Sequence, residues 1–337
     1  MTIQIAVTGA AGFIGSSLAL HLAQMGHGVH ACDWSDRSGR TPLDTPADST
    51  LARLRAERLG ILAQTPGVHL SQLDLAAPGA FSAWVSERQP DVVIHLAAQA
   101  GVRHSMQAPL DFVGPNLIGF AHVLDACHRQ GVQRLLYASS SSVYGMRDTA
   151  PFLEDDRTDS PESFYAATKQ ANEAMAKAYH AQYGLRSLGM RFFTVYGPRG
   201  RPDMAPFLFA QAIRRQETLT LFAEGELLRD FTYVDDTVAA IAALARPDAR
   251  WEGSTVVNLG HHRPVSVNSF VKCLADQLGL APIIAYAPMQ KADVKLTCAS
   301  ETRLLSMIGS WPDTPLDEGL GRFVDWLQDW DPLNQPG

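Results

Sequence analysis

The sequence predicts an α/β fold in which a doubly wound parallel sheet is joined to a smaller C-terminal domain. Three observations lead to this prediction. Short apolar runs of strand length alternate with helical patterns through the first half, the apolarity is continuous in runs such as 92–94, and a glycine-rich turn joins the first run to the first helix. Strand–helix alternation is typical of a parallel sheet covered by helices on both faces. Continuous apolarity, as in Val92-Val93-Ile94, is typical of strands buried on both sides.

The expected elements follow one another in the order that such a sheet requires. Strands are predicted at Ile3–Thr8, Gly28–Cys32, Val68–Leu73, Val92–Leu96, Arg134–Ala138 and Leu185–Phe192. Helices are predicted between them, for example at Gly15–Gln24, Asn116–Gln130 and Tyr165–Tyr183. The polar segment 34–50 is rich in Pro, Asp, Ser and Thr, a composition that predicts a mobile loop.

The pattern changes after about Thr194, where prolines and arginines cluster in Gly197–Pro206. We therefore expect one domain from residues 1–194 and a smaller domain from residues 195–337. A helix at Thr237–Ala245 and a strand at Thr255–Leu259 have the character of the first half, so the segment 232–260 is predicted to return to the main sheet. The chain is expected to finish with a helix at Leu316–Trp330.

Composition excludes several classes of function. The 337 residues are 46% hydrophobic and 19% charged, with a formal net charge of −7 and no block of Lys or Arg, so a nucleic-acid partner is not expected. The sequence has neither a basic leader nor an apolar run of membrane-spanning length, and we expect a cytoplasmic protein without a membrane partner. The four cysteines form no C-x-x-C pair and the histidines no H-E-x-x-H motif, so no metal site is predicted.

A glycine motif, Gly9-Ala-Ala-Gly12-Phe13-Ile14-Gly15, follows the first strand and opens the first helix. In this context Gly9 permits a tight turn, Gly12 lets a pyrophosphate approach the backbone, and Gly15 allows close helix–strand packing. The spacing is G-x-x-G-x-x-G rather than G-x-G-x-x-G. The first domain is therefore predicted to bind a dinucleotide.

Acidic residues after the next two strands favour NAD over NADP. Asp33 ends the second strand, where a carboxylate accepts hydrogen bonds from the adenosine ribose hydroxyls and repels a 2′-phosphate. Arg37 lies close to Asp33 in the sequence, and its positive charge weakens the preference for NAD over NADP. Asp74, after the third strand, is a candidate for contact with the adenine amino group.

Tyr165 and Lys169 form a Y-x-x-x-K pair within a predicted helix. Residues at i and i+4 share one face of a helix, so the phenol and the ammonium can enter the same cleft. A nearby ammonium and an oxidised nicotinamide ring both favour the phenolate, which would make Tyr165 a base at neutral pH. A Y-x-x-x-K pair alone is common by chance, but this pair follows a glycine motif and a serine cluster in the sequence, and the combination indicates a catalytic site.

That cluster, Ser139-Ser140-Ser141-Ser142, is predicted just past the fifth strand. In open α/β sheets, ligands bind outside the carboxyl ends of the strands. Four hydroxyls at this edge can donate to and accept from sugar oxygens.

These features together resemble the extended short-chain dehydrogenase/reductases that act on nucleotide sugars. The segments that carry the resemblance include His95-Leu-Ala-Ala-Gln99, Asn116-Leu-Ile-Gly119, Arg191-Phe-Phe-Thr194-Val-Tyr196-Gly-Pro198 and Arg229-Asp-Phe-Thr-Tyr-Val-Asp-Asp236. Within this family the chain looks most like UDP-glucuronate 4-epimerases. The segments that point to them are Gln99-Ala-Gly-Val-Arg103, Tyr137-Ala-Ser-Ser-Ser-Ser-Val-Tyr-Gly145 and Gly200-Arg-Pro-Asp-Met204.

The resemblance implies catalytic roles for three residues. Tyr165 would remove the proton of the sugar 4-hydroxyl while a hydride leaves C4, Lys169 would hold the nicotinamide ribose and keep Tyr165 ionised, and Ser140 would hydrogen-bond the same hydroxyl. NAD would be regenerated in each cycle and stay bound. The residues expected beside the cofactor are Gly9, Gly12, Phe13, Ile14, Gly15, Asp33, Asp74, Leu75, Leu96, Ala97, Ala98, Tyr165 and Lys169.

Substrate contacts are also implied by the resemblance. Ser141, Ser142 and Thr194 are candidates to bind the C6 carboxylate, since related dehydratases carry an Asp-Glu pair, and related decarboxylases a Glu, at the positions of the two serines. Arg229 and then Arg201 are the candidates for the diphosphate, and Asp293 for the nucleotide. Gln290 and Ala292 depart from the relatives' pattern and weaken the transfer of a second phosphate contact.

The function expected from the sequence is therefore C4 epimerisation of a UDP-sugar, UDP-glucuronate to UDP-galacturonate, by a homodimer with tightly bound NAD. Three alternatives stay open at this point: a UDP-hexose or UDP-N-acetylhexosamine 4-epimerase, a UDP-glucuronate decarboxylase, and a non-catalytic NAD-binding regulator on the same fold. The dimer is implied by the resemblance, through helices that begin near Pro115 and Tyr165.

Overall fold

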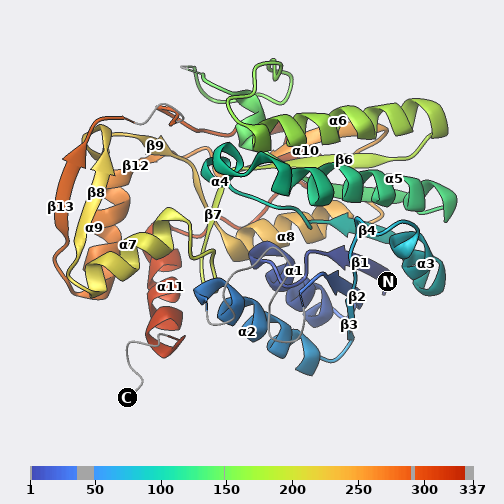
Figure 1. The fold of residues 1–337 in the computed structure, drawn as a ribbon, viewed down its shortest axis with the longest axis horizontal. Coiled ribbons are helices and arrows are strands. Elements are labelled where there is room, and N and C mark those ends of the chain that lie inside the picture. The colour runs from blue at the N-terminus through green and yellow to red at the C-terminus, as the bar shows by residue number, and fades with distance from the viewer. Residues whose placement is uncertain (1, 36–48, 148, 290–292, 331–337) are drawn as a thin grey trace.

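The computed structural model describes residues 2–35, 49–147, 149–289 and 293–330. Its larger part is a seven-stranded sheet with helices on both sides, and its smaller part groups short strands and helices at one end of that sheet (Figure 1). The larger part contains the N-terminus. The last helix, α11, belongs to the smaller part.

The main sheet has the strand order β11-β6-β5-β4-β1-β2-β3, and all neighbouring strands are parallel. The six strands expected in the first half are all present, and the expected strand near residue 255 joins the sheet beside β6 as its seventh member. Their bounds are β1 Gln4–Thr8, β2 Gly28–Asp33, β3 Val68–Gln72, β4 Val92–His95, β5 Arg134–Ser140, β6 Ser187–Phe192 and β11 Ser254–Leu259. This arrangement confirms the predicted fold class.

Helices cover the two faces of the sheet as separate hydrophobic layers. One layer packs α1, α2, α8 and α10 around residues such as Leu18, Leu54 and Ile241. The other packs α3, α5 and α6 around Phe81, Phe120 and Tyr137. The bounds of these helices are α1 Phe13–Gln24, α2 Thr50–Gln64, α3 Ala80–Arg88, α5 Gly119–Arg129, α6 Phe164–Tyr183, α8 Val234–Ala245 and α10 Thr302–Ile308.

The smaller part is built from short elements that extend the first hydrophobic layer. Two-stranded sheets pair β7 with β10, β9 with β12, and β8 with β13. The bounds are β7 Thr194–Tyr196, β8 Thr218–Phe222, β9 Leu228–Arg229, β10 Phe231–Tyr233, β12 Val265–Ser266, β13 Ile283–Ala287, α7 Ala205–Arg214, α9 Val267–Leu278 and α11 Leu316–Trp330. Because Phe207, Phe270 and Phe323 belong to the same hydrophobic cluster as β1 and α1, the two parts share one core.

The division into domains stays a proposal in the light of this shared core. The pairing of β11 with β6 and the packing of α8 against α1 support assigning 232–260 to the dinucleotide-binding part together with 1–194. The remainder of 195–337, including α7, α9 and α11, would then form the substrate part.

Some boundaries differ from those predicted. Strand β5 continues to Ser140, so the first two serines of the cluster lie in the strand and not beyond it. The helix expected at Asn116–Gln130 begins earlier, as the π-helix η2 (Val113–Ile118), and only then becomes α5. The loop expected at 34–50 includes residues 36–48, and with them Arg37, which lie outside the described residues; helix α2 already begins at Thr50.

Candidate active site

The glycine motif forms a tight turn between β1 and α1, and backbone crowding explains its composition. Gly9 has φ +75°, and a Cβ there would lie 2.7 Å from the Ala97 nitrogen. A Cβ at Gly15 would lie 2.1 Å from the Gly9 carbonyl oxygen, and one at Gly12 would lie 2.9 Å from the same oxygen. The turn therefore leaves no room for side chains at the three positions, as the sequence predicts for a dinucleotide loop.

Helix α1 presents its N-terminus at this turn. Gly12 is the N-cap, no side chain caps the helix, and its first turn carries no acidic residue. Uncapped N–H groups and the helix dipole attract anions, so this end of α1 suits a diphosphate. Phe13 and Ile14 are the first two residues of the helix, and Phe13 is buried in the core.

Asp33 is the last residue of β2 and lies against the glycine turn. Its Oδ2 accepts a hydrogen bond from the Ala11 N–H at 2.9 Å, and its Oδ1 accepts one from the Ser35 N–H at 3.1 Å. The carboxylate is thus fixed at the carboxyl edge of the sheet, where a ribose would lie in a doubly wound fold.

The segment after β4 closes the other side of the turn. The N–H groups of Leu96 and Ala97 donate to the carbonyl and the hydroxyl of Thr8, each at 3.2 Å. Ala98 follows directly. His95 lies behind this segment with its Nδ1 2.9 Å from the Thr8 hydroxyl. Burial, with a smaller effect from Lys169, lowers the pKa of His95 to about 3, so the imidazole is neutral and belongs to the packing.

Asp74 and Leu75 lie two and three residues after β3. Asp74 Oδ1 accepts a hydrogen bond from the Ala76 N–H at 2.8 Å, which fixes the carboxylate in its loop. The carbonyl of Leu75 is 2.8 Å from Nδ1 of His122, and its side chain is buried against Gly119. Both residues lie on the edge of the sheet that carries Asp33.

Tyr165 and Lys169 stand one helical turn apart in the first half of α6, and the sheet brings Ser140 to them. Ser163 caps α6 by accepting from the Ala166 N–H at 3.1 Å, which fixes the first turn that carries Tyr165. Lys169 is 2% exposed, donates to the Ala138 carbonyl at 2.9 Å, and places Nζ 5.8 Å from the centre of the Tyr165 ring. The three residues proposed for catalysis therefore lie together.

Burial acts on the pKa of both groups in this site. It raises the pKa of Tyr165, while the Ser140 hydroxyl and the Arg201 charge act in the lowering direction. It lowers the pKa of Lys169 to about 8. Burial is the largest of these effects on the pKa of Tyr165, so a low pKa of the phenol would depend on positive charge around it.

The side chains of the serine cluster point in two different directions. Ser139 is 2% exposed and donates to Glu173 Oε1 at 2.6 Å, so it faces the interior and not the expected sugar pocket. Ser140 caps the short helix η3 (Ser141–Tyr144) and accepts from both the N–H and the hydroxyl of Ser142, at 3.2 and 2.9 Å. Ser141 and Ser142 are half-buried beside Ser140. The expectation that all four hydroxyls face the sugar is wrong for Ser139.

A buried polar network behind the cluster fixes its position, and sequence reasoning gave it no role. Arg191 forms a two-pronged ion pair with Glu173, at 2.9 and 2.8 Å, and also donates to the Tyr144 hydroxyl at 2.9 Å. Tyr144 in turn donates to Asn258 Oδ1 at 2.6 Å. The network ties β5, α6, β6 and β11 together directly below the serines.

Asn116 is a second residue whose role only the structure reveals. It sits buried in the π-helix, accepts from the Gln99 N–H at 2.8 Å and donates to the Thr168 hydroxyl at 3.1 Å. π-Helical turns recur at functional sites because they displace side chains and carbonyls from helical register. Here the turn joins the segment after β4 to the helix that carries Tyr165.

Arg201 comes from the loop after β7 and reaches the same site. It donates to the Ala100 carbonyl at 3.1 Å and pairs with Asp203, and its charge acts on Tyr165. Its side chain is half-buried, with 29% of its surface exposed.

Arg229 and Asp293 interact electrostatically in the smaller part of the fold. Burial lowers the pKa of Arg229, and Asp293 opposes that effect. Arg229 also donates to the Leu228 carbonyl at 2.9 Å. Thr194 begins β7, where its N–H donates to the Asp230 carbonyl at 3.2 Å. Gln290 and Ala292 lie outside the described residues.

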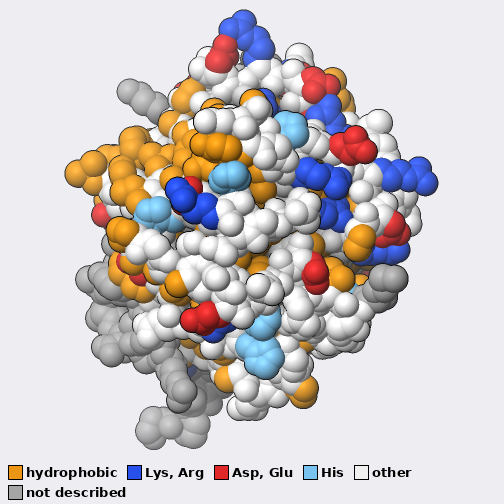
Figure 2. Space-filling view, turned by 90° about the vertical axis from the view of Figure 1, so that its right-hand side faces the viewer, with side chains coloured by type: hydrophobic (Ala, Val, Ile, Leu, Met, Phe, Trp, Pro, Cys, Tyr) orange, Lys and Arg blue, Asp and Glu red, His pale blue; other side chains and the backbone are white. Residues whose placement is uncertain are grey.

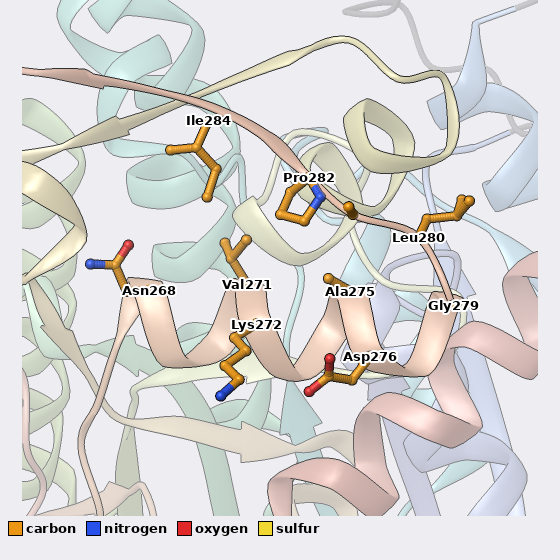
Figure 3. A pocket seen from close by; sticks show the side chains of 10 residues that line it. Asn268, Val271, Lys272, Ala275, Asp276, Gly279, Leu280, Pro282 and Ile284 are labelled. Carbon is orange, nitrogen blue, oxygen red and sulfur yellow. The ribbon is translucent and has the colours of Figure 1, made fainter.

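A separate surface pocket of about 600 Å³ lies between α9 and β13. Figure 3 shows Val271 and Ala275 of α9 pointing toward the chain that carries Pro282 and Ile284, while Lys272 and Asp276 point away from it. None of the residues expected to bind cofactor or substrate lines it, so it is distinct from the candidate active site.

Among the described residues, no group of three or more His, Cys, Asp or Glu side chains is arranged to hold a metal ion. None of the described helices has both the length and the apolar character needed to cross a bilayer.

The carboxyl edge of the sheet thus joins a dinucleotide turn to a Ser-Tyr-Lys group, the arrangement of an NAD-dependent enzyme that acts on a carbinol centre. Residues 5–260 match the model of the NAD dependent epimerase/dehydratase family. The chain belongs to this family.

Two relatives and one solved structure extend the match over almost the whole chain. Protein CapI of Staphylococcus aureus is 38% identical over 342 residues, covering 97% of this chain and 99% of the relative. A probable UDP-glucuronate 4-epimerase of Rhizobium meliloti is 38% identical over 336 residues, covering 95% of each. The UDP-glucuronic acid 4-epimerase of Bacillus cereus, solved in complex with UDP-glucuronic acid and NAD, superposes with a TM-score of 0.86 at 27% identity and covers 97% of this chain and 99% of its own.

Proposed function

We propose that this protein converts UDP-glucuronate to UDP-galacturonate by inverting C4 of the sugar through a 4-keto intermediate. The observation that carries the proposal is the grouping of Ser140, Tyr165 and Lys169 at the sheet edge, with hydroxyl side chains and no carboxylates at positions 141 and 142. The whole-length similarity to UDP-glucuronate 4-epimerases supports the choice of substrate.

The dinucleotide would be held by the turn at Gly9–Gly15, by Asp33, and by the segments 74–75 and 96–98. The crowded backbone of the turn and the uncapped end of α1 fit its diphosphate. Bound NAD supplies an acceptor for the hydride that leaves C4 and afterwards a donor that returns it to the opposite face. Lys169, buried and fixed on the Ala138 carbonyl, would hold the nicotinamide ribose.

Tyr165 would take the proton of the 4-hydroxyl and return it after the keto sugar has turned. Burial alone disfavours the phenolate, so the base depends on positive charge around it. Arg201 supplies part of that charge, and the oxidised nicotinamide would supply more. Ser140 would donate to the sugar oxygen and hold it in line with the phenol.

The C6 carboxylate must be restrained, because a 4-keto uronic acid is a β-keto acid and loses carbon dioxide when the breaking bond aligns with the carbonyl π system. Ser141, Ser142 and Thr194 would bind this carboxylate through hydroxyl donors without adding a repelling charge. Serines at positions 141 and 142 place no negative charge beside the carboxylate, which suits a uronate substrate.

Replacing Ser142 or Thr194 by alanine is expected to raise the fraction of decarboxylated product about ten-fold, because one charge-assisted hydrogen bond to the carboxylate contributes roughly 1.5 kcal/mol. The measurement is the ratio of UDP-pentose to UDP-galacturonate by liquid chromatography. Ser139→Ala is the matched control, since that hydroxyl donates to Glu173. A pentose ratio equal to that of the Ser139→Ala variant in both substitutions would remove this role for the hydroxyls.

Arg229 would neutralise the diphosphate of the nucleotide sugar, with Arg201 second and Asp293 placed to contact the nucleotide. Arg229 is half-buried, and burial lowers its pKa, an effect that a bound phosphate would oppose. The protein carries a net charge of −7, so such local cations are needed to attract a dianionic ligand.

The function is tested by turnover of UDP-glucuronate, UDP-glucose and UDP-N-acetylglucosamine at equal concentrations without added NAD. The proposal expects UDP-galacturonate as the main product, with kcat/KM for the two neutral sugars lower by about 10²-fold or more. Preferred turnover of a neutral sugar would assign the hexose or hexosamine alternative, and UDP-pentose as the main product would assign a decarboxylase. Tight NAD with no turnover of any sugar would assign the regulator.

We also propose a homodimer that packs α5 and α6 against the same helices of a partner. Large hydrophobic side chains are exposed around these helices, including Leu110 at 80% in the turn η1 (Pro109–Phe112) and Ile118 at 45%. Figure 2 looks onto the end of the molecule where α5 and α6 finish in Figure 1, and hydrophobic side chains gather in one part of that face. Exposed apolar patches of this kind mark interfaces.

The double substitution Leu110→Glu and Ile118→Glu is expected to convert the dimer to a monomer, because two charges per subunit would be buried without partners. Light scattering after gel filtration measures the mass, which should fall from twice the chain mass to once. Leu280→Glu, at a position 39% exposed near α9, is the control and should leave the dimer intact. A dimer that persists in the double variant would rule out this interface.

A further inference from the structure

Arg58, in the middle of α2, is a buried cation that the proposed chemistry does not use. It is 2% exposed, and its Nε is buried without a hydrogen-bond partner. Among the described residues, no carboxylate lies within ion-pair distance of its guanidinium, although Glu57 and Asp33 favour its charge from further away. Burial lowers the pKa of Arg58 to about 9, so it still carries its charge at neutral pH. A charge buried in this way is costly unless the surroundings use it.

The two ends of the guanidinium hold two different loops. Nη1 donates to the carbonyl of Ala11, within the glycine turn, at 2.9 Å. Nη2 donates to the carbonyls of Arg199 and Gly200, at 2.6 and 3.3 Å. Ala11 is also the residue whose N–H donates to Asp33. One planar group therefore joins the cofactor turn to the loop that follows β7.

The second loop is held in a strained conformation. Arg199 has φ +58° and Gly197 has φ +144°, and the Gly200 N–H closes the bend on the Gly197 carbonyl at 3.1 Å. Glu57, the neighbour of Arg58, accepts from the Arg199 side chain at 2.9 Å. Such backbone conformations persist only where the surroundings fix them, and they concentrate at functional sites. Adjacent residues of α2 thus hold both the backbone and the side chain of Arg199.

The next residue along this loop is Arg201, whose charge acts on Tyr165. A continuous path of contacts therefore runs from the glycine turn through Arg58 and the bend at 199–200 to the substrate arginine. Displacing the bend would displace Arg201 from the Ala100 carbonyl that now holds it.

We infer that Arg58 is a positioning residue that couples the dinucleotide turn to the substrate loop, so that its loss weakens NAD and the nucleotide sugar together. This inference rests on the proposed NAD-dependent function. Its guanidinium fixes the carbonyls of both loops, and its charge lies beside the turn that would hold the NAD diphosphate. Lysine cannot replace it, because a single ammonium cannot span carbonyls on two loops in the fixed planar geometry of a guanidinium.

The test compares Arg58→Lys and Arg58→Met with one control. Arg246→Met removes a cation that is 57% exposed and paired with Asp248. The readouts are the NAD released after gel filtration, quantified by mass spectrometry, and the dissociation constant of UDP for the holoprotein by calorimetry. We expect Arg58→Lys and Arg58→Met to release NAD about ten-fold faster and to bind UDP about ten-fold more weakly, a typical size for coupling between sites. Arg246→Met should leave both NAD release and UDP affinity unchanged.

A purely structural role for Arg58 would lower the melting temperature but leave NAD release and UDP affinity of the folded protein within two-fold of the parent, and this result would overturn the inference. If Arg58→Met does not fold, Arg58→Lys carries the test. Neither readout requires turnover, so a protein that epimerises no sugar but shows the joint weakening would refute the proposed function and keep the coupling.

Discussion

Tyr165→Phe is expected to lower kcat by about 10²- to 10⁴-fold while NAD stays bound, because the variant loses the only proton acceptor proposed for the 4-hydroxyl. The ring is held by its contact with Phe112, 6.1 Å between ring centres, and phenylalanine keeps that packing. UDP affinity should therefore change little. The measurement is the kcat for UDP-glucuronate together with the NAD content of the purified variant.

The control for this experiment is Tyr183→Phe, which removes a hydroxyl from the last residue of the same helix, where the side chain is 46% exposed. Its kcat should match that of the parent. An unchanged kcat in Tyr165→Phe would mean that another group takes the proton.

Burial raises the pKa of Tyr165, and the charge of Arg201 opposes this effect. Arg201→Met should therefore shift the acid-side limb of the kcat profile to higher pH.

Gly15→Ala is expected to lower the free energy of unfolding by about 1–3 kcal/mol and to release NAD, although it adds one methyl group. A Cβ at this position would lie 2.1 Å from the Gly9 carbonyl oxygen and 3.3 Å from the Ala10 Cα, so the turn must move away from the helix. That movement would displace the N-terminus of α1 that is proposed to bind the diphosphate. Urea unfolding and NAD content after purification measure the two effects.

Gly60→Ala is the matched substitution for this comparison. Gly60 lies in α2, and a Cβ there meets nothing within 4 Å. Alanine should stabilise this helix by up to about 1 kcal/mol, because it has the higher helix propensity. If Gly15→Ala behaved like Gly60→Ala, the glycine turn would not be the crowded cofactor loop proposed here.

Local sequence patterns were sufficient for the larger part of the fold. The parallel strands are short, largely apolar and separated by helical patterns, so each could be located without knowledge of its neighbours. The Tyr165–Lys169 pair and the glycine motif were also predictable, because both depend on spacing within one element or one turn. The two-stranded sheets of the smaller part were not predicted, because four of their six strands have only two or three residues and no regular strand–helix alternation marks this region.

The serine cluster shows how an error in the predicted end of a strand leads to wrong side-chain directions. Successive residues of a strand face opposite sides, so extending β5 by two residues would have predicted that Ser139 and Ser140 point in different directions. The prediction ended the strand at Ala138 and treated the four hydroxyls as equivalent. The structure instead pairs Ser139 with Glu173, 34 residues away.

Arg58 and the Glu173–Arg191 pair lay beyond sequence reasoning for a different reason. Arg58 contacts Ala11 and Arg199, which are 47 and 141 residues away in the chain. In a helix that contains both polar and apolar residues, the sequence around an arginine looks the same whether its side chain is solvated or buried. Only the tertiary arrangement separates a positioning residue from a surface cation.

The central claim is that C4 is oxidised and then reduced again by one dinucleotide that never leaves the site. It is tested most directly with UDP-glucuronate carrying deuterium at C4, supplied to the purified protein without added NAD. The account predicts UDP-galacturonate that retains the deuterium at C4, because the same hydrogen returns to the other face. Product that has lost the deuterium to solvent would contradict it, since inversion would then proceed by exchange of a proton and not by transfer of a hydride.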